Sequence, residues 1–327
     1  MRRRRAPEPA PPPAARLSPE QALRRLELTV TRRLDGILHG AHQGLLPGPG
    51  SEPGETRVYV PGEDEVRRMD WYVTARTTVP HVRDQIADRE LETWALVDLS
   101  ASMDFGTTTM EKRDLAVAGL AAVGFLSGRV GDRLGAYVLH GGELHRWPAR
   151  PGRVALHGLL HSIIDAPASP PAPPDAIDLP EALTRLARSH RKRGMRVIIS
   201  DFLDPSSPEG AAWAPPLRRL AARHHVLAVE VLDPRELELP DVGLVTLTDP
   251  ETGGTREVYL SRRVRAAYRE AAAAQRAGTE AALRRIGVPH LVLRTDRDWV
   301  FDIARFVLAQ RRSARALHFH PARGARR

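Results

Sequence analysis

A short loop in the first third of the chain places three oxygen-bearing side chains on alternate residues. Asp98, Ser100 and Ser102 directly follow the apolar run at residues 94–97. In open α/β sheets ligands gather at the carboxyl ends of strands, and three such side chains in one turn can converge on a point. Carboxylate and hydroxyl oxygens are hard donors that suit Mg²⁺ or Mn²⁺ better than zinc. The loop therefore predicts a site for a magnesium or manganese ion.

A second carboxylate follows another apolar run. Residues 195–200 end in Ser200, and Asp201 comes next. Two carboxylates in one small site repel each other, and a cation between them relieves the repulsion. An isolated Asp-x-Ser-x-Ser sequence more often caps a helix or closes a turn. The position after a strand, together with Asp201, favours the ion site over that structural alternative.

Short apolar runs alternate with amphipathic segments, and this pattern predicts the elements that position these side chains. It is typical of an α/β fold with a doubly wound, mostly parallel sheet. Several runs lack period-two alternation, as central strands covered on both faces should. The predicted strands are residues 94–97, 134–139, 195–200, 226–231 and 290–293.

Capping residues and turn residues locate the connecting segments. Thr108 and Glu111 form a capping-box pattern that predicts a helix to about residue 127, and Asp178 with Glu181 is a related helix start. We also expect an inserted β-hairpin formed by residues 244–247 and 257–260. A long helix at 262–286 and a last helix at 299–311 should follow it.

The formal charge of +9 belongs to the chain ends. Residues 1–16 hold five Arg and one Glu, and residues 311–327 hold six Arg and no acidic residue, which together amount to +10. The body between them therefore carries about −1 and offers no net positive field to a phosphate backbone. Aromatic residues make up 5% of the chain, so stacking platforms for bases are not evident. We expect no specific binding of nucleic acid.

Other classes are excluded by what the sequence lacks. With no cysteine, disulfides and thiolate chemistry are impossible. No stretch approaches the roughly 20 apolar residues of a membrane span, and the N-terminus lacks a signal-peptide core, so we expect a cytoplasmic protein without a membrane span. There is no P-loop and no Gly-x-Ser-x-Gly elbow. His157 and His161 have helix-face spacing for zinc but no metalloprotease glutamate, and we expect a structural pair.

Residues 97–103, Val-Asp-Leu-Ser-Ala-Ser-Met, resemble the metal-ion-dependent adhesion site (MIDAS) of von Willebrand factor A (vWA) domains. Further motifs resemble the DUF58 family, bacterial proteins with a vWA-like domain. Downstream these motifs are residues 233–236, 249–253 and 295–299. The upstream signature includes Arg57, Tyr59, Asp64, Arg68, Asp70, Trp71 and Arg76. The resemblance covers roughly residues 36–312.

The resemblance implies that two serines and a threonine ligate the ion, with aspartates acting directly or through water. The matching positions are Asp98, Ser100, Ser102 and Asp201. The threonine position holds Ile177, which offers no oxygen. The ion then loses a ligand, takes a water, or recruits Asp178 or Asp175. Asp178 is a candidate ligand, although we favour its competing role as a helix cap.

The charged signature segment has two interpretations. It could be an exposed surface for a partner, since Arg and Trp are favoured at interface hot spots. We favour an internal ion-pair network with Trp71 as its buried anchor. The domain organisation that we expect is a disordered basic tail at 1–16, an N-terminal helix (17–38) and signature segment at 17–90 packed on the main domain, a vWA-like domain at 91–311, and a disordered basic tail at 312–327.

Three functions stay open. The leading hypothesis is a non-enzymatic module for protein interaction, in which a partner's Asp or Glu completes the coordination of the ion. The resemblance implies that the partner is a MoxR-type AAA+ ATPase, with this chain as a chaperone or assembly adaptor. The alternatives are a metal-assisted hydrolase that activates water at the same cluster, and a structural vWA scaffold with a vestigial metal site, which Ile177 favours.

Overall fold

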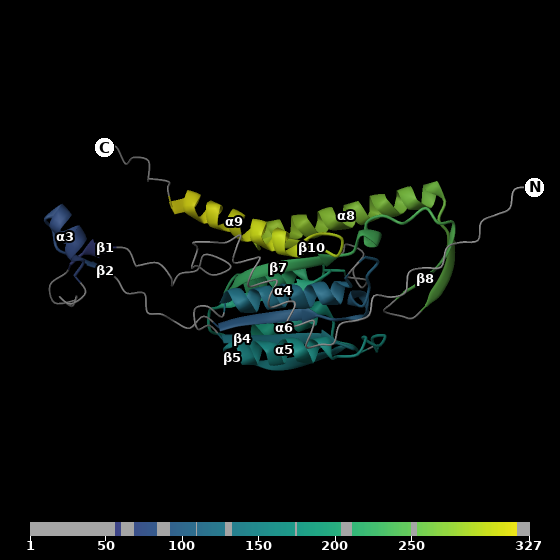
Figure 1. Ribbon diagram of the computed structural model, residues 1–327, viewed down its shortest axis with the longest axis horizontal. Coiled ribbons are helices and arrows are strands. Elements are labelled where there is room, and N and C mark those ends of the chain that lie inside the picture. The colour runs from purple at the N-terminus through teal and green to yellow at the C-terminus, as the bar shows by residue number, and fades with distance from the viewer. Residues whose placement is uncertain are drawn as a thin grey trace, which may run out of the picture.

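The computed structural model describes residues 56–59, 69–83, 92–108, 110–127, 133–173, 175–203, 211–249 and 254–318 (Figure 1). The expected helix at 17–38, the tail at 1–16, and the signature residues Asp64 and Arg68 lie outside the described residues. In the described part of the chain, no helix combines the length and apolar character that crossing a bilayer demands.

The central sheet has six strands, and all but one of them run parallel. Across the sheet the order is β10 (His290–Arg294), β7 (His225–Leu232), β6 (Met195–Ser200), β3 (Glu92–Asp98), β4 (Arg133–His140) and the antiparallel edge strand β5 (Glu143–Pro151). The chain starts in the middle at β3, moves to one edge, and returns to the other side of β3 at β6. The strand order therefore reverses between β3 and β6, where doubly wound sheets bind their ligands.

Helices cover both faces of this sheet (Figure 1). One face packs on α4 (Lys112–Ser127), α5 (Arg153–Ile164) and α9 (Trp299–His318). The other packs on α6 (Leu179–Ser189), α7 (Ala214–Ala221) and the end of α8 (Arg262–Ile286). Alternate residues of β3 enter different layers, because successive strand side chains point to opposite faces. Ala95 and Val97 join the first core, whereas Trp94 and Leu96 join the second.

The α/β fold class and the five strands predicted from the sequence are confirmed. The hairpin is also present, as β8 (Leu244–Thr248) paired antiparallel with β9 (Thr255–Tyr259), and α8 has the predicted bounds. Two differences concern helix ends. The hydroxyl of Thr108 donates to the carbonyl of Thr295 (2.9 Å), and α4 begins at Lys112. Helix α9 continues to His318, so residues 312–318 are helical rather than part of a disordered tail.

A separate small element lies upstream of the main sheet. Strands β1 (Thr56–Val58) and β2 (His81–Arg83) pair antiparallel, and α3 (Trp71–Thr77) lies between them in the sequence. Asp70 caps α3, since its carboxylate accepts hydrogen bonds from the backbone N–H groups of the second and third helical residues.

Candidate functional site

Asp98 is the last residue of β3, and its side chain is buried. Its Oδ1 accepts a hydrogen bond from the backbone N–H of Ser100 (3.0 Å), and its Oδ2 accepts one from the hydroxyl of Ser200 (2.7 Å). The second bond joins the carboxyl ends of neighbouring strands β3 and β6. The carboxylate is therefore fixed at the point where the strand order reverses.

The two serines of the loop continue this network. Ser102 lies in a short 3₁₀ turn, η3 (Ala101–Met103), and its hydroxyl donates to Oδ2 of Asp201 (2.8 Å). The hydroxyl oxygens of Ser100 and Ser102 are 3.3 Å apart. The structure thus brings together four side chains that the sequence singled out. We call Asp98, Ser100, Ser102 and Asp201 the oxygen cluster.

Lys112, which the sequence reasoning missed, extends into the oxygen cluster from the first turn of α4. Its Nζ lies 2.8 Å from Oδ2 of Asp201 and 2.5 Å from Oε1 of Glu236, and its side chain has no solvent exposure. Burial alone lowers the pKa of Lys112, but the charges of Asp201 and Glu236 outweigh it and raise that pKa above its ordinary value. A charged ammonium is therefore built into the site.

Negative charge is in excess around this ammonium. Burial, and then the charge of Asp201, raise the pKa of Asp98 to about 6, although hydrogen bonds from Ser200 and Ser100 act against the rise. Burial also raises the pKa of Glu236, and the charge of Lys112 only partly offsets it. One cation is too few to balance three carboxyl groups, so a further cation would stabilise their ionised forms.

The donor set of the oxygen cluster fits a small hard cation, since it offers two carboxylates and two hydroxyls. Among the residues that the structure describes, no three His, Asp or Glu side chains gather as they would around a metal ion, so an ion here relies on the serines as well. Ile177 packs against the core on the α6 face. Asp178 caps α6, as its sequence position predicts, and accepts from the backbone N–H of Glu181 (2.8 Å). Its candidacy as a ligand stays a prediction.

Asp233, just after β7, holds Glu236 in place. Its carboxylate accepts hydrogen bonds from the hydroxyls of Thr107 (2.6 Å) and Thr295 (2.8 Å), which tie the ends of β7 and β10 to the loop before α4. Its backbone N–H donates to Oε2 of Glu236 (3.0 Å) in a capping box around η5 (Pro234–Glu236). Burial raises the pKa of Asp233, but these hydrogen bonds outweigh burial and lower it. The motif at 233–236 therefore positions the second partner of Lys112.

The signature segment is not drawn into the oxygen cluster. Trp71 is 66% exposed, so the expectation that it is a buried anchor is wrong. A seven-residue helix with no buried residue has no core of its own to anchor. Arg76 is exposed in the last turn of α3, Arg57 lies on β1 opposite Val82, and the N–H of Tyr59 donates to the carbonyl of Pro80 (2.8 Å). Exposure at Trp71 fits the alternative interpretation, a surface for a partner.

An exposed apolar surface lies on the hairpin β8–β9. Leu244 and Tyr259 are directly opposite each other in the antiparallel register and are 62% and 66% exposed, and neighbouring Val242 is 59% exposed. The hairpin follows the carboxyl end of β7 and precedes α8, and Figure 1 shows it set off from the sheet beside the start of α8. It therefore leaves the sheet at the same edge as the oxygen cluster. We call Val242, Leu244 and Tyr259 the hairpin patch.

Two features define a vWA-like domain. The strand order reverses between β3 and β6, and at that point the Asp-x-Ser-x-Ser loop after β3 faces Asp201 after β6. Residues 55–278 match the family described as "Protein of unknown function DUF58". The chain belongs to the DUF58 family.

Several relatives and solved structures are similar to this chain. The uncharacterized proteins Rv1480 of Mycobacterium tuberculosis and Mb1516 of Mycobacterium bovis are each 57% identical to it over 297 residues, 91% of both chains. The solved structures include BatB from Bacteroides thetaiotaomicron (14% identity, TM-score 0.43, 68% of this chain and 99% of that one). A von Willebrand factor type A structure from Catenulispora acidiphila has 11% identity and a TM-score of 0.36, over 71% of this chain and 43% of that one. Likeness of this size carries no information on function, and the fold follows from the strand order.

Proposed function

We propose that this chain is a non-enzymatic protein-interaction module that contacts its partner with the carboxyl edge of its sheet. The observation that carries the proposal is the hairpin patch, which lies at the same edge as the oxygen cluster. Contiguous exposed apolar side chains mark interaction surfaces, and Tyr is favoured among residues that dominate binding energy. An apolar contact beside a polar, charged one gives such a surface both affinity and specificity.

We further propose that the oxygen cluster holds Mg²⁺ or Mn²⁺. The support is its hard donor set and the raised pKa of Asp98, which burial and then the charge of Asp201 cause. The ion, when bound, supplies a positive centre that recognises an Asp or Glu of the partner. The chain's own residues prepare the site, because Ser200 orients Asp98 while Ser102 and Lys112 orient Asp201.

Binding is favoured over hydrolysis by the contacts of Asp201. A metal-assisted hydrolase needs a general base that can accept a proton from water. Asp201 instead accepts from the hydroxyl of Ser102, the ammonium of Lys112 and the backbone N–H of Leu203 (3.0 Å). A carboxylate with its oxygens engaged in this way is suited to a fixed electrostatic role.

The partner that we propose is a MoxR-type AAA+ ATPase, for which this chain would act as a chaperone or assembly adaptor. The support is membership of the DUF58 family, together with the partner that the motif resemblance in the sequence implies.

Biolayer interferometry between the full chain and the MoxR-type ATPase of the same organism tests the proposal. We expect capture in Mg²⁺ that is lost in EDTA, in Asp98→Asn and in Tyr259→Ser. The matched control is Val154→Ser, which removes an exposed apolar side chain (87% exposed) from the start of α5. Capture that survives EDTA and Asp98→Asn but not Tyr259→Ser would support the surface and contradict the ion. Equal binding by Tyr259→Ser and wild type would contradict the surface.

A further inference from the structure

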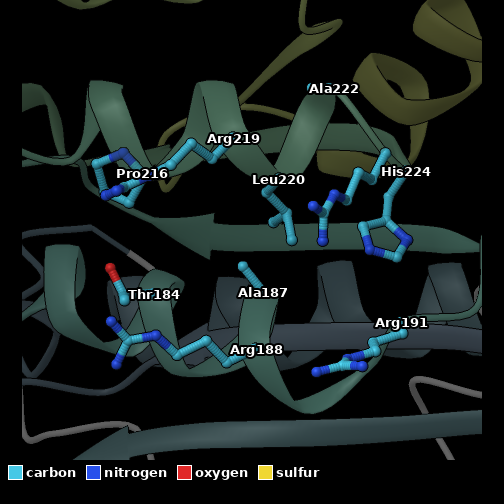
Figure 2. Close-up of a pocket in the computed structure, with 10 residues that line it drawn as sticks. Thr184, Ala187, Arg188, Arg191, Pro216, Arg219, Leu220, Ala222 and His224 are labelled. Carbon is cyan, nitrogen blue, oxygen red and sulfur yellow. The ribbon is translucent and has the colours of Figure 1, made fainter.

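A groove of about 660 Å³ runs between α6 and α7. Figure 2 shows the two helices on either side of it, with Ala187 and Leu220 facing each other between them. Pro216 and Leu220 are buried, so the floor is apolar. The rim is formed by four exposed arginines, Arg188, Arg191, Arg219 and Arg223.

The groove is a different surface from the oxygen cluster. Its residues extend to the ends of α6 and α7 and to the connections that lead into β6 and β7 at their amino ends. The oxygen cluster lies beyond the carboxyl ends of β3 and β6. A ligand in the groove would therefore leave the proposed partner surface free.

The arginines of the rim have no acidic partner of their own in the described part of the chain. By contrast, Arg185 on the same helix α6 pairs with Glu181 at 2.9 Å. No ion pair among the described residues involves the four rim arginines. Like charges gathered without counter-charges favour an anionic ligand.

His224 closes one end of the groove (Figure 2). It is 7% exposed, and its ring Nδ1 is buried without a hydrogen-bond partner among the described residues. Burial, and then the charges of Arg196 and Arg223, lower its pKa to about 4, so the ring is neutral near pH 7. An unsatisfied buried polar atom is costly, and a ligand group that reaches this nitrogen would remove the cost.

We propose that this groove binds an acidic, leucine-bearing segment of a partner protein. The guanidinium groups of Arg188 and Arg219 match carboxylates with paired N–H donors, and the floor around Leu220 takes the apolar side chains. An amphipathic segment lying in a groove between helices is an established way to recognise a peptide. A single-stranded nucleic acid is the other polyanion to consider, but it binds by stacking on aromatic rings. Among the residues that the structure describes, no Phe, Tyr or Trp lines the groove, which favours the peptide.

Fluorescence anisotropy with the full chain tests this proposal. The probe is a fluorescein-labelled peptide of Glu, Leu and Ala with its leucines on one helical face. Arg188→Gln combined with Arg219→Gln should weaken binding by roughly tenfold or more. The matched control, Arg262→Gln with Arg263→Gln, removes the same charge from exposed positions on α8 and should bind like wild type. A peptide with Ser in place of Leu should bind several-fold more weakly.

Four outcomes would overturn the proposal. Equal losses in both double variants would show that only overall charge matters. Equal binding of the Leu and Ser peptides would show that the apolar floor is not used. Stronger competition by an oligothymidylate of the same charge would assign the groove to nucleic acid. A rim variant that unfolds at a lower temperature but binds the peptide normally would show that the arginines only stabilise the helix ends.

Discussion

Replacing Lys112 by Met would leave one buried carboxylate, that of Asp201, and one partly buried carboxylate, that of Glu236, without the ammonium between them. Lys112 has no solvent exposure and contacts Asp201 at 2.8 Å and Glu236 at 2.5 Å. Met has nearly the same length, so little of the effect comes from an empty cavity. Removing one partner of a buried ion pair costs about 3–5 kcal/mol, because the other charge is left uncompensated. We expect the free energy of unfolding to fall by that amount.

Urea denaturation followed by circular dichroism measures this change, with and without Mn²⁺. Two substitutions serve as comparisons. Lys192→Met removes an exposed lysine and should change the free energy of unfolding by less than about 0.5 kcal/mol. Lys112→Arg keeps the charge, but the guanidinium is larger and planar, and it does not fit where a compact ammonium bridges two carboxylates. We therefore expect Lys112→Arg to be destabilised as well.

The ion dependence separates the roles of charge and packing. Mn²⁺ at about 100 times its Kd stabilises a folded protein by about 2.7 kcal/mol. We expect Lys112→Met to gain at least as much from Mn²⁺ as wild type, since its oxygen cluster carries one more uncompensated negative charge. If the free energy of unfolding of Lys112→Met fell by less than about 1 kcal/mol, a buried ion pair of this strength would be refuted. A variant that loses stability but responds less to Mn²⁺ than wild type would refute the electrostatic reasoning.

Three further predictions concern other polar and titratable groups. Asp233→Ala should lower the free energy of unfolding by about 2–3 kcal/mol in urea titrations, because it leaves hydroxyl donors without their charged acceptor. Burial, and then the charge of Arg196, lower the pKa of His190, the C-cap of α6, and of His224 to about 4 from the ordinary 6.5. The unfolded chain therefore binds more protons, and stability falls as pH drops from 6.5 toward 4. Because His190→Gln removes one of these histidines, urea titrations at pH 7 and 5 should show a shallower fall in stability in this variant than in wild type. The raised pKa of Asp98 acts in the opposite direction in both proteins. Glu236→Gln removes one negative charge and should weaken Mn²⁺ binding by roughly tenfold or more in isothermal titration; an unchanged Kd would contradict this.

The fold could be predicted wherever residues are buried on both faces. The central strands are almost continuously apolar, so composition alone reveals them. Edge strand β5 was missed because most of it is exposed, and it contains Pro148 and Pro151, which are unfavourable inside a sheet. Helix α7 was missed because it is short and its first turn contains Pro215 and Pro216, which also occur in loops.

The oxygen cluster could be predicted in part, because its four residues directly follow strands and parallel strands end at one edge. Lys112 and Glu236 could not be, since their contact joins a helix to a distant turn and depends on tertiary packing. The composition gave one indication that Lys112 is unusual. The chain has 49 Lys and Arg residues, yet only Lys112 and Lys192 are lysines. A lysine at a helix start in so arginine-rich a chain is a candidate for a role that arginine cannot fill.

A built-in ammonium does not make the proposed ion redundant, because the charges around it do not balance. Glu236 and Asp201 contact the same Nζ at 2.5 and 2.8 Å, so their oxygens are at most about 5.3 Å apart. At that separation and an effective dielectric constant of about 20, two unit charges repel by about 3 kcal/mol. Two carboxylates contact the ammonium, and Asp98 interacts with one of them, Asp201. These three carboxylates outnumber the one ammonium, and the two negative charges left over equal the charge of one divalent ion. Lys112 then supplies a contact that orients Asp201 before an ion binds, so lysine and ion have complementary roles in one site.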